Sequence, residues 1–301
     1  MEYPNFHDRD GFIWFDGELI PWREANLHVL SHGLHYASSV FEGERAYNGK
    51  IFKLREHSQR LIDSASALEM DIPFSVEALD EATQKTVEAN GLANCYVRPV
   101  AWKGSEQMGV INTQGNTHVA IATWPWDYIS AEVWGKGLRL CEARYRKMSN
   151  ECFPATVKAA GLYTVNTLNK NQAQRKGYDD ALVLGSRGKI AESTSANIFL
   201  VIDGKLHTPI PDCFLNGITR QTVIKLAASE GIEVMERDIE PNELAAASEV
   251  FLTGTAVELT PVSQIDFEEK HFKFTVGGPV EIRLIDAFRE LTGMVAKAAT
   301  V

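Results

Sequence analysis

The sequence predicts a mixed α+β protein of two domains, and three observations favour this fold class. The chain has 301 residues, of which 45% are hydrophobic and 23% charged, as in globular proteins of about two domains. The pairs Asp16-Gly17 and Asn48-Gly49 each separate two strand-like runs, and such pairs favour the two-residue turns of β-hairpins. Helical and strand-like patterns then alternate along the rest of the chain.

The first part of the chain predicts one α+β unit. Leu61, Ala65 and Leu68 recur at helical spacing, and Asn90-Gly91 ends the helical pattern that follows them. The expected elements are two hairpins (12–20 and 42–54), two helices (55–70 and 75–90) and two strands (95–102 and 118–124).

The stretch between Trp124 and Gly137 interrupts this pattern with proline and glycine, which is typical of a domain boundary. We therefore predict a smaller N-terminal α+β domain (1–124), a linker (125–136) and a larger C-terminal domain (137–301). The elements expected in the larger domain are strands at 138–143, 181–184, 197–202, 233–237 and 249–253 and helices at 163–176, 219–231 and 279–292. Asp203-Gly204 is expected to form another hairpin turn after the strand at 197–202.

Charge and hydropathy exclude several classes of partner. The 40 acidic and 30 basic residues leave a net charge of −10, which argues against nucleic acid or an anionic membrane as a partner. No apolar run approaches the roughly 20 residues of a membrane-spanning helix, and the first residues lack the basic and apolar regions of a signal peptide.

The four cysteines indicate a reducing compartment. Cys95, Cys141, Cys152 and Cys213 are scattered without the C-x-x-C spacing of redox or zinc sites. We expect plain thiols in a cytoplasmic protein.

Three histidines form the one pattern in the sequence that suggests a metal site. His28, His32 and His35 are spaced four and three apart, which would place three imidazoles on one face of a helix. Gly33 weakens a helix there, and no neighbouring carboxylate or thiol completes a ligand set. We therefore expect structural or pocket-lining histidines and no metal, with a metal-dependent hydrolase as an alternative of another class.

Lys158 is a candidate nucleophile. It stands among small and apolar residues in TVKAAGLYTVN, and an apolar setting lowers the pKa of an amine from its usual value of about 10.4. Tyr163, five residues later, could contact the same ligand.

Two segments resemble anion sites, and a third carries a carboxylate. In LNGITR, Gly217 allows close backbone approach, and Thr219 is expected to cap a helix whose first amides could bind phosphate. In TGTA, Thr255 and Ala256 follow a strand and offer further backbone donors. Glu192 is expected just before a strand, where it could keep a ring nitrogen protonated or simply be solvated.

Together these segments resemble the class IV pyridoxal-phosphate aminotransferases, and most closely the branched-chain amino acid aminotransferases. The similarity runs from about residue 11 to 295. The motifs that carry it, in chain order, are SHGLHYASSVFEGERAY, REHSQRLIDSA, YVRP, EQMGV, TVKAAGLY, ESTSANIF, LNGITR and TGTAVELTPV. The resemblance implies the two-domain fold-type IV architecture of the D-amino acid aminotransferase-like enzymes and transfer of amino groups between leucine, isoleucine or valine and 2-oxoglutarate.

The resemblance implies roles for the cofactor-binding residues. Lys158 would form the Schiff base with pyridoxal 5'-phosphate and shuttle the proton, and Glu192 would pair with the pyridinium nitrogen. Tyr163 would hydrogen-bond the ring hydroxyl, and Leu215 would pack on the ring. The phosphate would be bound by Arg60, Ile218, Thr219 and Thr255.

The resemblance also implies a substrate pocket and an assembly. The pocket residues would be Tyr36, Phe41, Gly43, Arg45, Tyr96, Arg98, Thr255 and Ala256. Arg45, Tyr96 and the amides of Thr255 and Ala256 would hold the α-carboxylate, and Arg98 the distal carboxylate of glutamate or 2-oxoglutarate. Active sites of this family lie at a subunit interface, so a homodimer or an assembly of dimers is implied. Ala37 and Val257 depart from the residues common in the family and bear on substrate range.

Other activities occur on the same fold. They are those of D-amino acid transaminases, (R)-amine transaminases and aminodeoxychorismate lyases, and the SVFEGER and YVRP segments favour the branched-chain type. A non-catalytic binding module is disfavoured because the lysine and the ring-pairing glutamate are both present.

Overall fold

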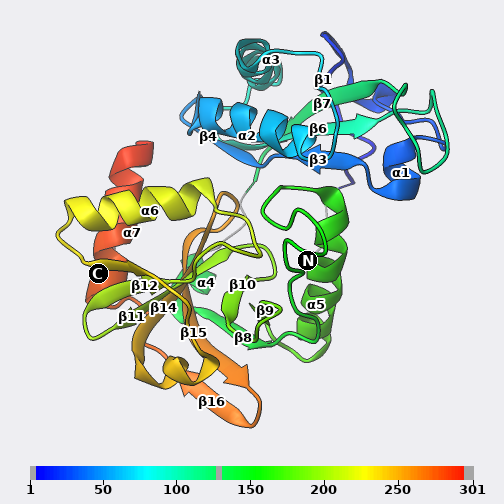
Figure 1. Ribbon diagram of the computed structural model, residues 1–301. Coiled ribbons are helices and arrows are strands. Elements are labelled where there is room, and N and C mark those ends of the chain that lie inside the picture. Colours follow the sequence, from blue (N-terminus) through cyan, green and yellow to red (C-terminus); the bar gives the residue numbers. More distant parts are fainter. Residues whose placement is uncertain (1–4, 127–130, 295–301) are drawn as a thin grey trace. The chain divides into compact units, whose positions relative to one another are not determined.

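The structure is a computed structural model that describes residues 5–126 and 131–294 (Figure 1). Its internal contacts divide the chain into two compact units, Met1–Trp126 with Val157–Gly161, and Asp127–Thr156 with Leu162–Val301. The segment that carries Lys158 therefore belongs by its contacts to the first unit, whereas the expected domain boundaries assign it to the C-terminal domain. In the expected linker, residues 127–130 lie outside the described residues, and helix α4 (Ala131–Lys136) follows them.

The first unit contains a seven-stranded sheet whose order is β2-β1-β7-β6-β4-β5, with β3 also paired to β6. Its strands are β1 (Phe12–Phe15), β2 (Glu18–Pro21), β3 (Ser39–Phe41), β4 (Glu44–Tyr47), β5 (Lys50–Ile51), β6 (Cys95–Lys103) and β7 (Thr117–Trp124). Its helices are η1 (Trp22–Glu24), α1 (His32–Tyr36), α2 (Leu54–Ser66) and α3 (Val76–Ala89).

Both predicted hairpins of this unit are confirmed. β1 pairs with β2, and β4 with β5, in antiparallel registers that bring Phe15 opposite Glu18 and Tyr47 opposite Lys50. The turn residues Asp16-Gly17 and Asn48-Gly49 all have positive φ, as two-residue hairpin turns require.

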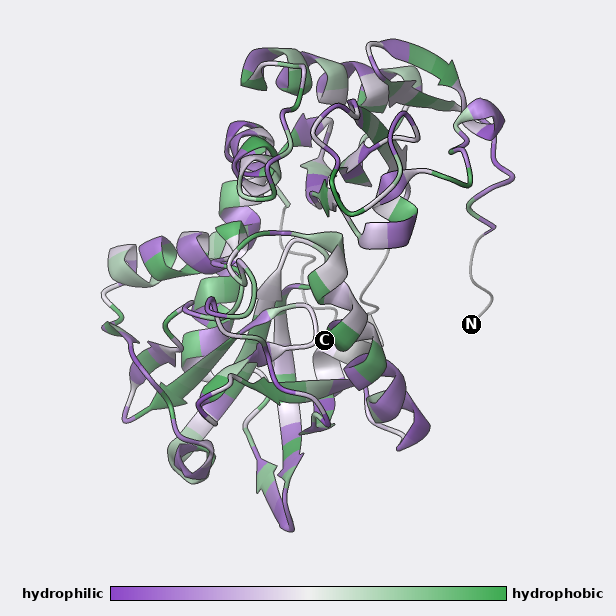
Figure 2. Cartoon of the chain, turned by 45° about the vertical axis from the view of Figure 1, so that its right-hand side comes forward, coloured by the Kyte–Doolittle hydropathy of each residue, from purple (hydrophilic) through white to green (hydrophobic). Residues whose placement is uncertain are grey.

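Helices α2 and α3 lie side by side and pack against the sheet (Figure 1). Leu61 of α2, Leu79 of α3 and Val97 of β6 belong to one buried apolar cluster. The helices are banded purple and green in Figure 2, because apolar and polar residues alternate at helical spacing. Since Val97 points into this core, its neighbours Tyr96 and Arg98 lie on the other face of β6.

The second unit contains a nine-stranded sheet that closes on itself. Its strands are β8 (Leu138–Glu142), β9 (Asp180–Leu184), β10 (Ile190–Ser193), β11 (Asn197–Ile202), β12 (Lys205–Thr208), β13 (Val234–Glu236), β14 (Ala247–Gly254), β15 (Glu258–Phe267) and β16 (Lys270–Lys273). Their order is β10-β9-β8-β15-β14-β11-β12-β13, with β16 on β15. Because β10 also pairs with β11, the six strands from β10 to β11 in this order form a closed ring.

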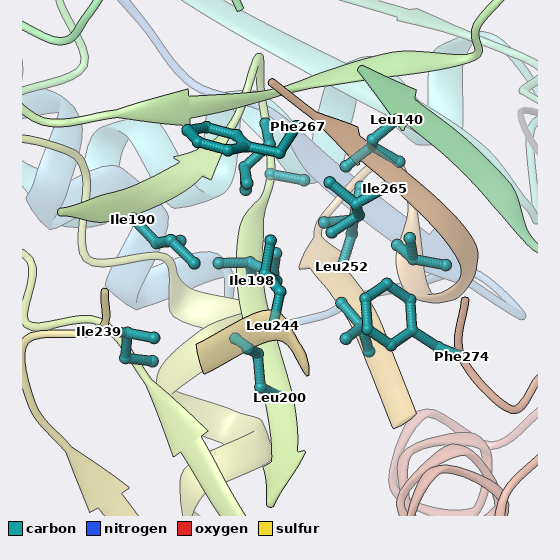
Figure 3. Close-up of a cluster of buried hydrophobic side chains, with 14 of the residues drawn as sticks. Leu140, Ile190, Ile198, Leu200, Ile239, Leu244, Leu252, Ile265, Phe267 and Phe274 are labelled. Atoms are coloured by element: carbon teal, nitrogen blue, oxygen red, sulfur yellow. The ribbon is translucent and has the colours of Figure 1, made fainter. Parts of the chain in front are cut away.

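The side chains inside the ring form the larger apolar core (Figure 3). Leu140, Ile198, Leu252 and Ile265 come from four of the strands and are each at most 1% exposed. Helices outside the ring pack against several strands of this sheet, and β9 and β11 are buried along their whole length. Besides α4, the helices and the short helical turn of this unit are α5 (Tyr163–Arg175), α6 (Ile218–Ser229), η3 (Pro241–Ala246) and α7 (Pro279–Thr292), and the turn η2 (Ala160–Leu162) spans the boundary between the two units.

Three strands of this unit were not expected from the sequence. β10 is four residues long with two polar positions, β15 contains Pro261, and β16 is mostly polar. None of them shows the apolar alternation that predicts a strand.

None of the helices within the described residues combines the length and apolarity needed to cross a bilayer.

Two buried carboxyl groups lie where β14 contacts the start of α7. Glu249 accepts hydrogen bonds from the backbone amides of Val280 (3.4 Å) and Glu281 (2.8 Å), so it caps this helix from another element. Glu281 accepts one from the amide of Gly277 (2.8 Å) and is fully buried. Burial, reinforced by the neighbouring Glu249, raises the pKa of Glu281 to about 7.

We expect this group to make stability depend on pH. Glu281 holds its proton more tightly in the folded state than in the unfolded state, whose pKa is about 4.3. The contribution of Glu281 to the free energy of unfolding is therefore largest below about pH 4.3, and roughly 3–4 kcal/mol of it is lost as the pH rises through 7. Glu281→Gln removes this loss, so denaturant unfolding at pH 5 and pH 8 should show the variant gaining stability relative to the wild type as the pH rises. The exposed Glu290→Gln on the same helix is the control, and an unchanged pH dependence in Glu281→Gln would contradict the assignment.

Candidate active site

Lys158 lies in the first unit, held by its backbone against β3 and α2. Its amide donates to Ser64 Oγ (3.2 Å), and its carbonyl accepts from the amide of Phe41 (3.2 Å). The amine nitrogen lies 5.1 Å from the centre of the Phe41 ring. Burial lowers the pKa of Lys158 to about 8, with Glu42 opposing the shift and Arg60 and Arg98 adding to it. About one-tenth of the amine is therefore unprotonated at pH 7, far more than for an ordinary lysine, and this form can act as a nucleophile or a base.

A fully buried carboxylate holds the Arg60 guanidinium. Glu42 accepts hydrogen bonds from Arg60 Nε (2.6 Å) and Nη2 (2.8 Å) and contacts His57 Nδ1 at 2.7 Å. Burial alone would raise the pKa of Glu42, but Arg60 and His57 outweigh it and hold the pKa well below its usual range. Burial lowers the pKa of His57, so His57 is neutral at pH 7 and donates its Nδ1 proton to Glu42. Glu42 and His57 were not among the site residues predicted from the sequence.

Four of the predicted substrate residues of the first unit lie on β3, β4 and β6, and Gly43 lies between β3 and β4. Arg45 on β4 lies opposite Tyr96 on β6. Arg98 Nη2 donates to the Tyr96 hydroxyl (3.2 Å), and its guanidinium lies 4.8 Å from the centre of the Phe41 ring. A side chain at Gly43 would overlap the Tyr96 hydroxyl, so glycine is required there. Tyr36 is on α1, where its ring stands 4.6 Å from that of His32 and is 46% exposed.

An apolar cavity of about 420 Å³ lies beside Arg98 within the first unit. Arg98, Ser39 and Ala160 are among the residues that line it, and most of the remaining lining is apolar, including Ile13, Phe15, Leu27, Leu34, Val100 and Trp102. The Arg98 Nε is buried and has no hydrogen-bond partner among the described residues. The cavity thus combines an aliphatic lining with a cation that can bind one more anionic group.

In the second unit, Glu192 is placed inside β10, not just before a strand as expected. Its carboxylate accepts from Asn197 Nδ2 (3.0 Å) and lies 2.6 Å from Lys147 Nζ. Tyr163, the other predicted ring contact, is the first residue of α5.

The LNGITR segment starts α6, and buried polar side chains hold its loop. The helix begins at Ile218 with Gly217 as N-cap, and no side chain caps it, so the expected capping role of Thr219 is wrong. Asn197 binds this loop twice, donating to the carbonyl of Leu215 (3.0 Å) and accepting from the amide of Gly217 (3.1 Å). The first amides of α6 therefore have no side-chain cap and remain suited to an anion.

Arg220 fixes the other side of this loop. It is 1% exposed, and it donates to Asn216 Oδ1 (2.9 Å), the carbonyl of Pro209 (2.9 Å) and Glu236 Oε2 (2.7 Å). Thr255 and Ala256 lie in the turn after β14, which the amide of Val257 closes by donating to the carbonyl of Gly254 (3.2 Å). The sequence indicated both anion-site loops but not the side chains, Asn197 and Arg220, that hold the LNGITR loop.

The three histidines do not form a metal site. Only His32 and His35 are in α1, because the helix begins at His32, and His28 precedes it. His32 contacts Ser38 Oγ and the carbonyl of Gly109 (2.8 Å), and His35 contacts the carbonyl of Val29 (2.9 Å). Within the ranges that the structure covers, no group of three His, Cys, Asp or Glu side chains could hold a metal ion.

The chain is similar to known proteins over most of its length. The family described as Amino-transferase class IV matches residues 39–265. The branched-chain-amino-acid aminotransferase of Pseudomonas aeruginosa is 40% identical over 291 residues, which cover 94% of each chain. The crystal structure of the Escherichia coli branched-chain amino acid aminotransferase superposes with a TM-score of 0.89 and 37% identity, covering 97% of this chain and 98% of that one. A T.th. branched-chain amino acid aminotransferase complexed with N-(5'-phosphopyridoxyl)-L-glutamate gives a TM-score of 0.88, with 38% identity and 96% coverage of both chains.

Proposed function

The chain belongs to the class IV aminotransferases and, within them, to the branched-chain amino acid aminotransferases, and from this membership we propose how its residues divide the work of transamination. It is a pyridoxal-phosphate-dependent aminotransferase of branched-chain amino acids. We assign the amino donors to leucine, isoleucine and valine and the acceptor to 2-oxoglutarate, and the complex of the T.th. relative with a glutamate adduct supports the acceptor.

The residues fit pyridoxal phosphate on three counts. Lys158 has an amine with a lowered pKa, Arg60 is a guanidinium held in place by Glu42, and Glu192 is a buried carboxylate beside Lys147. When bound, the cofactor supplies an electron sink for negative charge that develops on the substrate α-carbon.

Lys158 is the residue that binds the cofactor covalently and moves the proton at the substrate α-carbon. Because its pKa of about 8 is close to neutral pH, the amine can both accept and return a proton at a small free-energy cost. Its backbone contacts with Ser64 and Phe41 hold the start of the side chain in place, so the amine moves through its own rotamers.

The remaining cofactor contacts divide between the phosphate and the ring. Arg60, the amides of Ile218 and Thr219, and Thr255 bind the phosphate, because a guanidinium and a helix start both favour a doubly charged anion. Glu192 keeps the ring nitrogen protonated, Tyr163 hydrogen-bonds the ring hydroxyl, and Leu215 packs on the ring face.

We propose that the apolar cavity beside Arg98 lets one site take two kinds of side chain. We assign the α-carboxylate to Arg45, Tyr96 and the amides of Thr255 and Ala256, near Tyr36, Phe41 and Gly43. The aliphatic lining suits leucine, isoleucine and valine, and the distal carboxylate of 2-oxoglutarate pairs with Arg98. With an aliphatic substrate, the Arg98 cation keeps its contacts with Phe41 and the Tyr96 hydroxyl.

We expect Arg98→Ala to separate the two half-reactions. Loss of a charge-assisted pair should lower the efficiency with 2-oxoglutarate by about 2–3 kcal/mol of transition-state binding, with a far smaller change for leucine. Single-turnover measurements of each half-reaction test this, with Arg139→Ala, an arginine that stacks on Tyr178 in the second unit, as control. Equal losses in both half-reactions would show that Arg98 serves the shared α-carboxylate or only the fold.

Chemical labelling tests the assignment of Lys158 directly. Borohydride reduction of the protein with its cofactor, followed by peptide mass spectrometry, should place the phosphopyridoxyl group on the peptide that contains Lys158. A label on any other lysine would contradict the assignment.

We further propose that the protein is a homodimer, or an assembly of dimers, in the cytoplasm. Two segments of the first unit expose large apolar side chains, at Val29 and Leu34 around α1 and at Val110 and Ile111 in the loop between β6 and β7. The contact of His32 with the carbonyl of Gly109 joins these segments into one surface, on which Val110 is 85% exposed. Sedimentation equilibrium tests the dimer, and a monomer at micromolar concentration would contradict it.

The cysteines support the proposed location in the cytoplasm. All four are free thiols, and three of them are buried.

A further inference from the structure

A buried lysine contacts the carboxylate that we assign to the cofactor ring. Lys147 follows β8, and its amide donates to the carbonyl of Leu184 at the end of β9 (2.8 Å). Its side chain is 11% exposed, and its ammonium lies 2.6 Å from Glu192 Oε1 and 2.9 Å from Asn166 Oδ1 of α5. Lys147 therefore contacts three elements, β9 through its amide and β10 and α5 through its ammonium. These contacts hold the ammonium against β10 and away from solvent.

The hydrogen bonds of Glu192 leave room for one more donor. Lys147 occupies one carboxylate oxygen, and Asn197 Nδ2 occupies the other at 3.0 Å. An ionised carboxylate has about four acceptor positions, so the proposed N–H of the cofactor ring can be added without displacing either partner. Lys147 thus has a place in the site both before and after the cofactor binds.

Glu192 is buried together with its cation. The Glu192 side chain is 9% exposed, and a buried carboxylate that loses its ion-pair partner is strongly destabilising. The pKa of the neighbouring Cys213 thiol also reflects the burial of this region. Burial raises the pKa of Cys213 to about 12, with Asp212 and Glu192 adding to the shift and Lys147 opposing it.

We propose that Lys147 is a positioning residue that keeps Glu192 ionised and oriented for the cofactor ring nitrogen. The inference rests on the proposed role of Glu192. A protonated Glu192 would be neutral, and a neutral carboxyl group cannot hold a positive charge on the ring nitrogen. Lys147 therefore acts on the reaction through Glu192, and Asn166 and Asn197 hold the two side chains in register.

A double-mutant cycle tests this action through Glu192. Lys147→Met should slow the half-reaction with leucine by about 10–100-fold, the scale for loss of a supporting partner, and Lys147→Arg should restore most of the rate. In a Glu192→Gln background, Lys147→Met should change the rate less than about twofold, because the amide needs no cation. Lys170→Met is the matched control, since Lys170 pairs with buried Asp180 (3.2 Å) in the same unit and should leave the rate unchanged.

A second readout uses the full chain freed of cofactor. Lys147→Met leaves a buried carboxyl without its cation, so its melting temperature should fall by roughly 5 °C or more, and adding Glu192→Gln should recover most of the loss. The infrared difference between Lys147→Met and the double variant should show the carbonyl stretch of a protonated carboxyl group.

Each outcome decides the inference. Equal rate losses from Lys147→Met in both backgrounds, or no loss in either, would overturn it and leave Glu192 in its proposed role. If Glu192→Gln alone leaves the rate unchanged, the proposed role of Glu192 fails, and the inference fails with it. A rate loss confined to the Glu192 background, with rescue by arginine and a protonated carboxyl signal, supports the inference.

Discussion

Replacing Lys158 with alanine is expected to abolish transamination and to leave the fold intact. The substrate α-carbon needs a base beside it, and removal of a positioned base costs up to about 10⁴-fold before the lost covalent bond to the cofactor is counted. The backbone hydrogen bonds of residue 158 to Ser64 and Phe41 survive in alanine. Glu42 keeps Arg60 and His57 as partners, so no carboxylate is orphaned.

Steady-state turnover of leucine with 2-oxoglutarate measures this loss. Circular dichroism and the melting temperature establish that the variant folds. Lys158→Arg separates charge from basicity, because arginine keeps the positive charge but cannot release its proton, and it should be equally inactive. The exposed Lys205→Ala, which only breaks a surface ion pair with Glu233, is the control. Near-normal turnover in Lys158→Ala would mean that another amine performs the reaction.

Replacing Glu192 with glutamine is expected to slow the leucine half-reaction by about 10²–10³-fold, the scale for loss of one preorganised electrostatic contact. The amide has nearly the shape of the carboxylate and can still accept from Asn197, so the site keeps its geometry. It carries no charge, and the ring nitrogen then loses its proton and with it much of its capacity to accept electrons. The phosphate contacts are untouched, so the dissociation constant of the cofactor should rise by less than about tenfold.

Two measurements separate these effects. Rapid mixing with saturating leucine gives the rate of the half-reaction, and equilibrium dialysis of the cofactor gives its dissociation constant. The exposed Glu233→Gln is the control. An unimpaired rate in Glu192→Gln would remove this residue from the mechanism, whereas parallel losses in rate and affinity would indicate that it anchors the cofactor as a whole.

Local turn chemistry accounts for what the sequence predicted well. Asp16-Gly17 and Asn48-Gly49 adopt positive φ, and this conformation depends only on the turn residues and their immediate neighbours. The two hairpins can therefore be predicted from a short stretch of sequence. The helices α2, α3, α6 and α7 likewise follow from apolar spacing within one element. β15 could not be predicted in this way, because its stability comes from partners on both sides, β14 and β8, which lie far from it in the chain or across a turn.

The candidate site follows the same division. Residues that carry the chemistry, such as Lys158 and Glu192, stand in motifs that the sequence makes visible, and their roles stay predictions. The side chains that position other parts of the site are not visible in such motifs, because they lie far away in the sequence. Glu42 binds Arg60 from 18 positions away, and Asn197 binds the amide of Gly217 from 20 positions away. One signal was available for Glu42. His57 and Arg60 are three residues apart on α2, so two donors on one helix face indicate a common acceptor.

The closed ring of strands has a consequence for how the protein is made. β8 pairs with β15, and the hydrogen bond from Ser263 Oγ to the carbonyl of Leu138 joins residues 125 positions apart. During synthesis, β8, β9, β10 and β11 emerge long before β15, so one edge of the growing sheet stays unsatisfied until nearly the whole chain has left the ribosome. Pairings of such long range form slowly, and the nascent chain exposes apolar strands while it waits. Because β15 is synthesised late, the sheet of this unit can close only after β15 pairs with β8 and β14. A chain truncated before Glu258 would keep an open, aggregation-prone sheet.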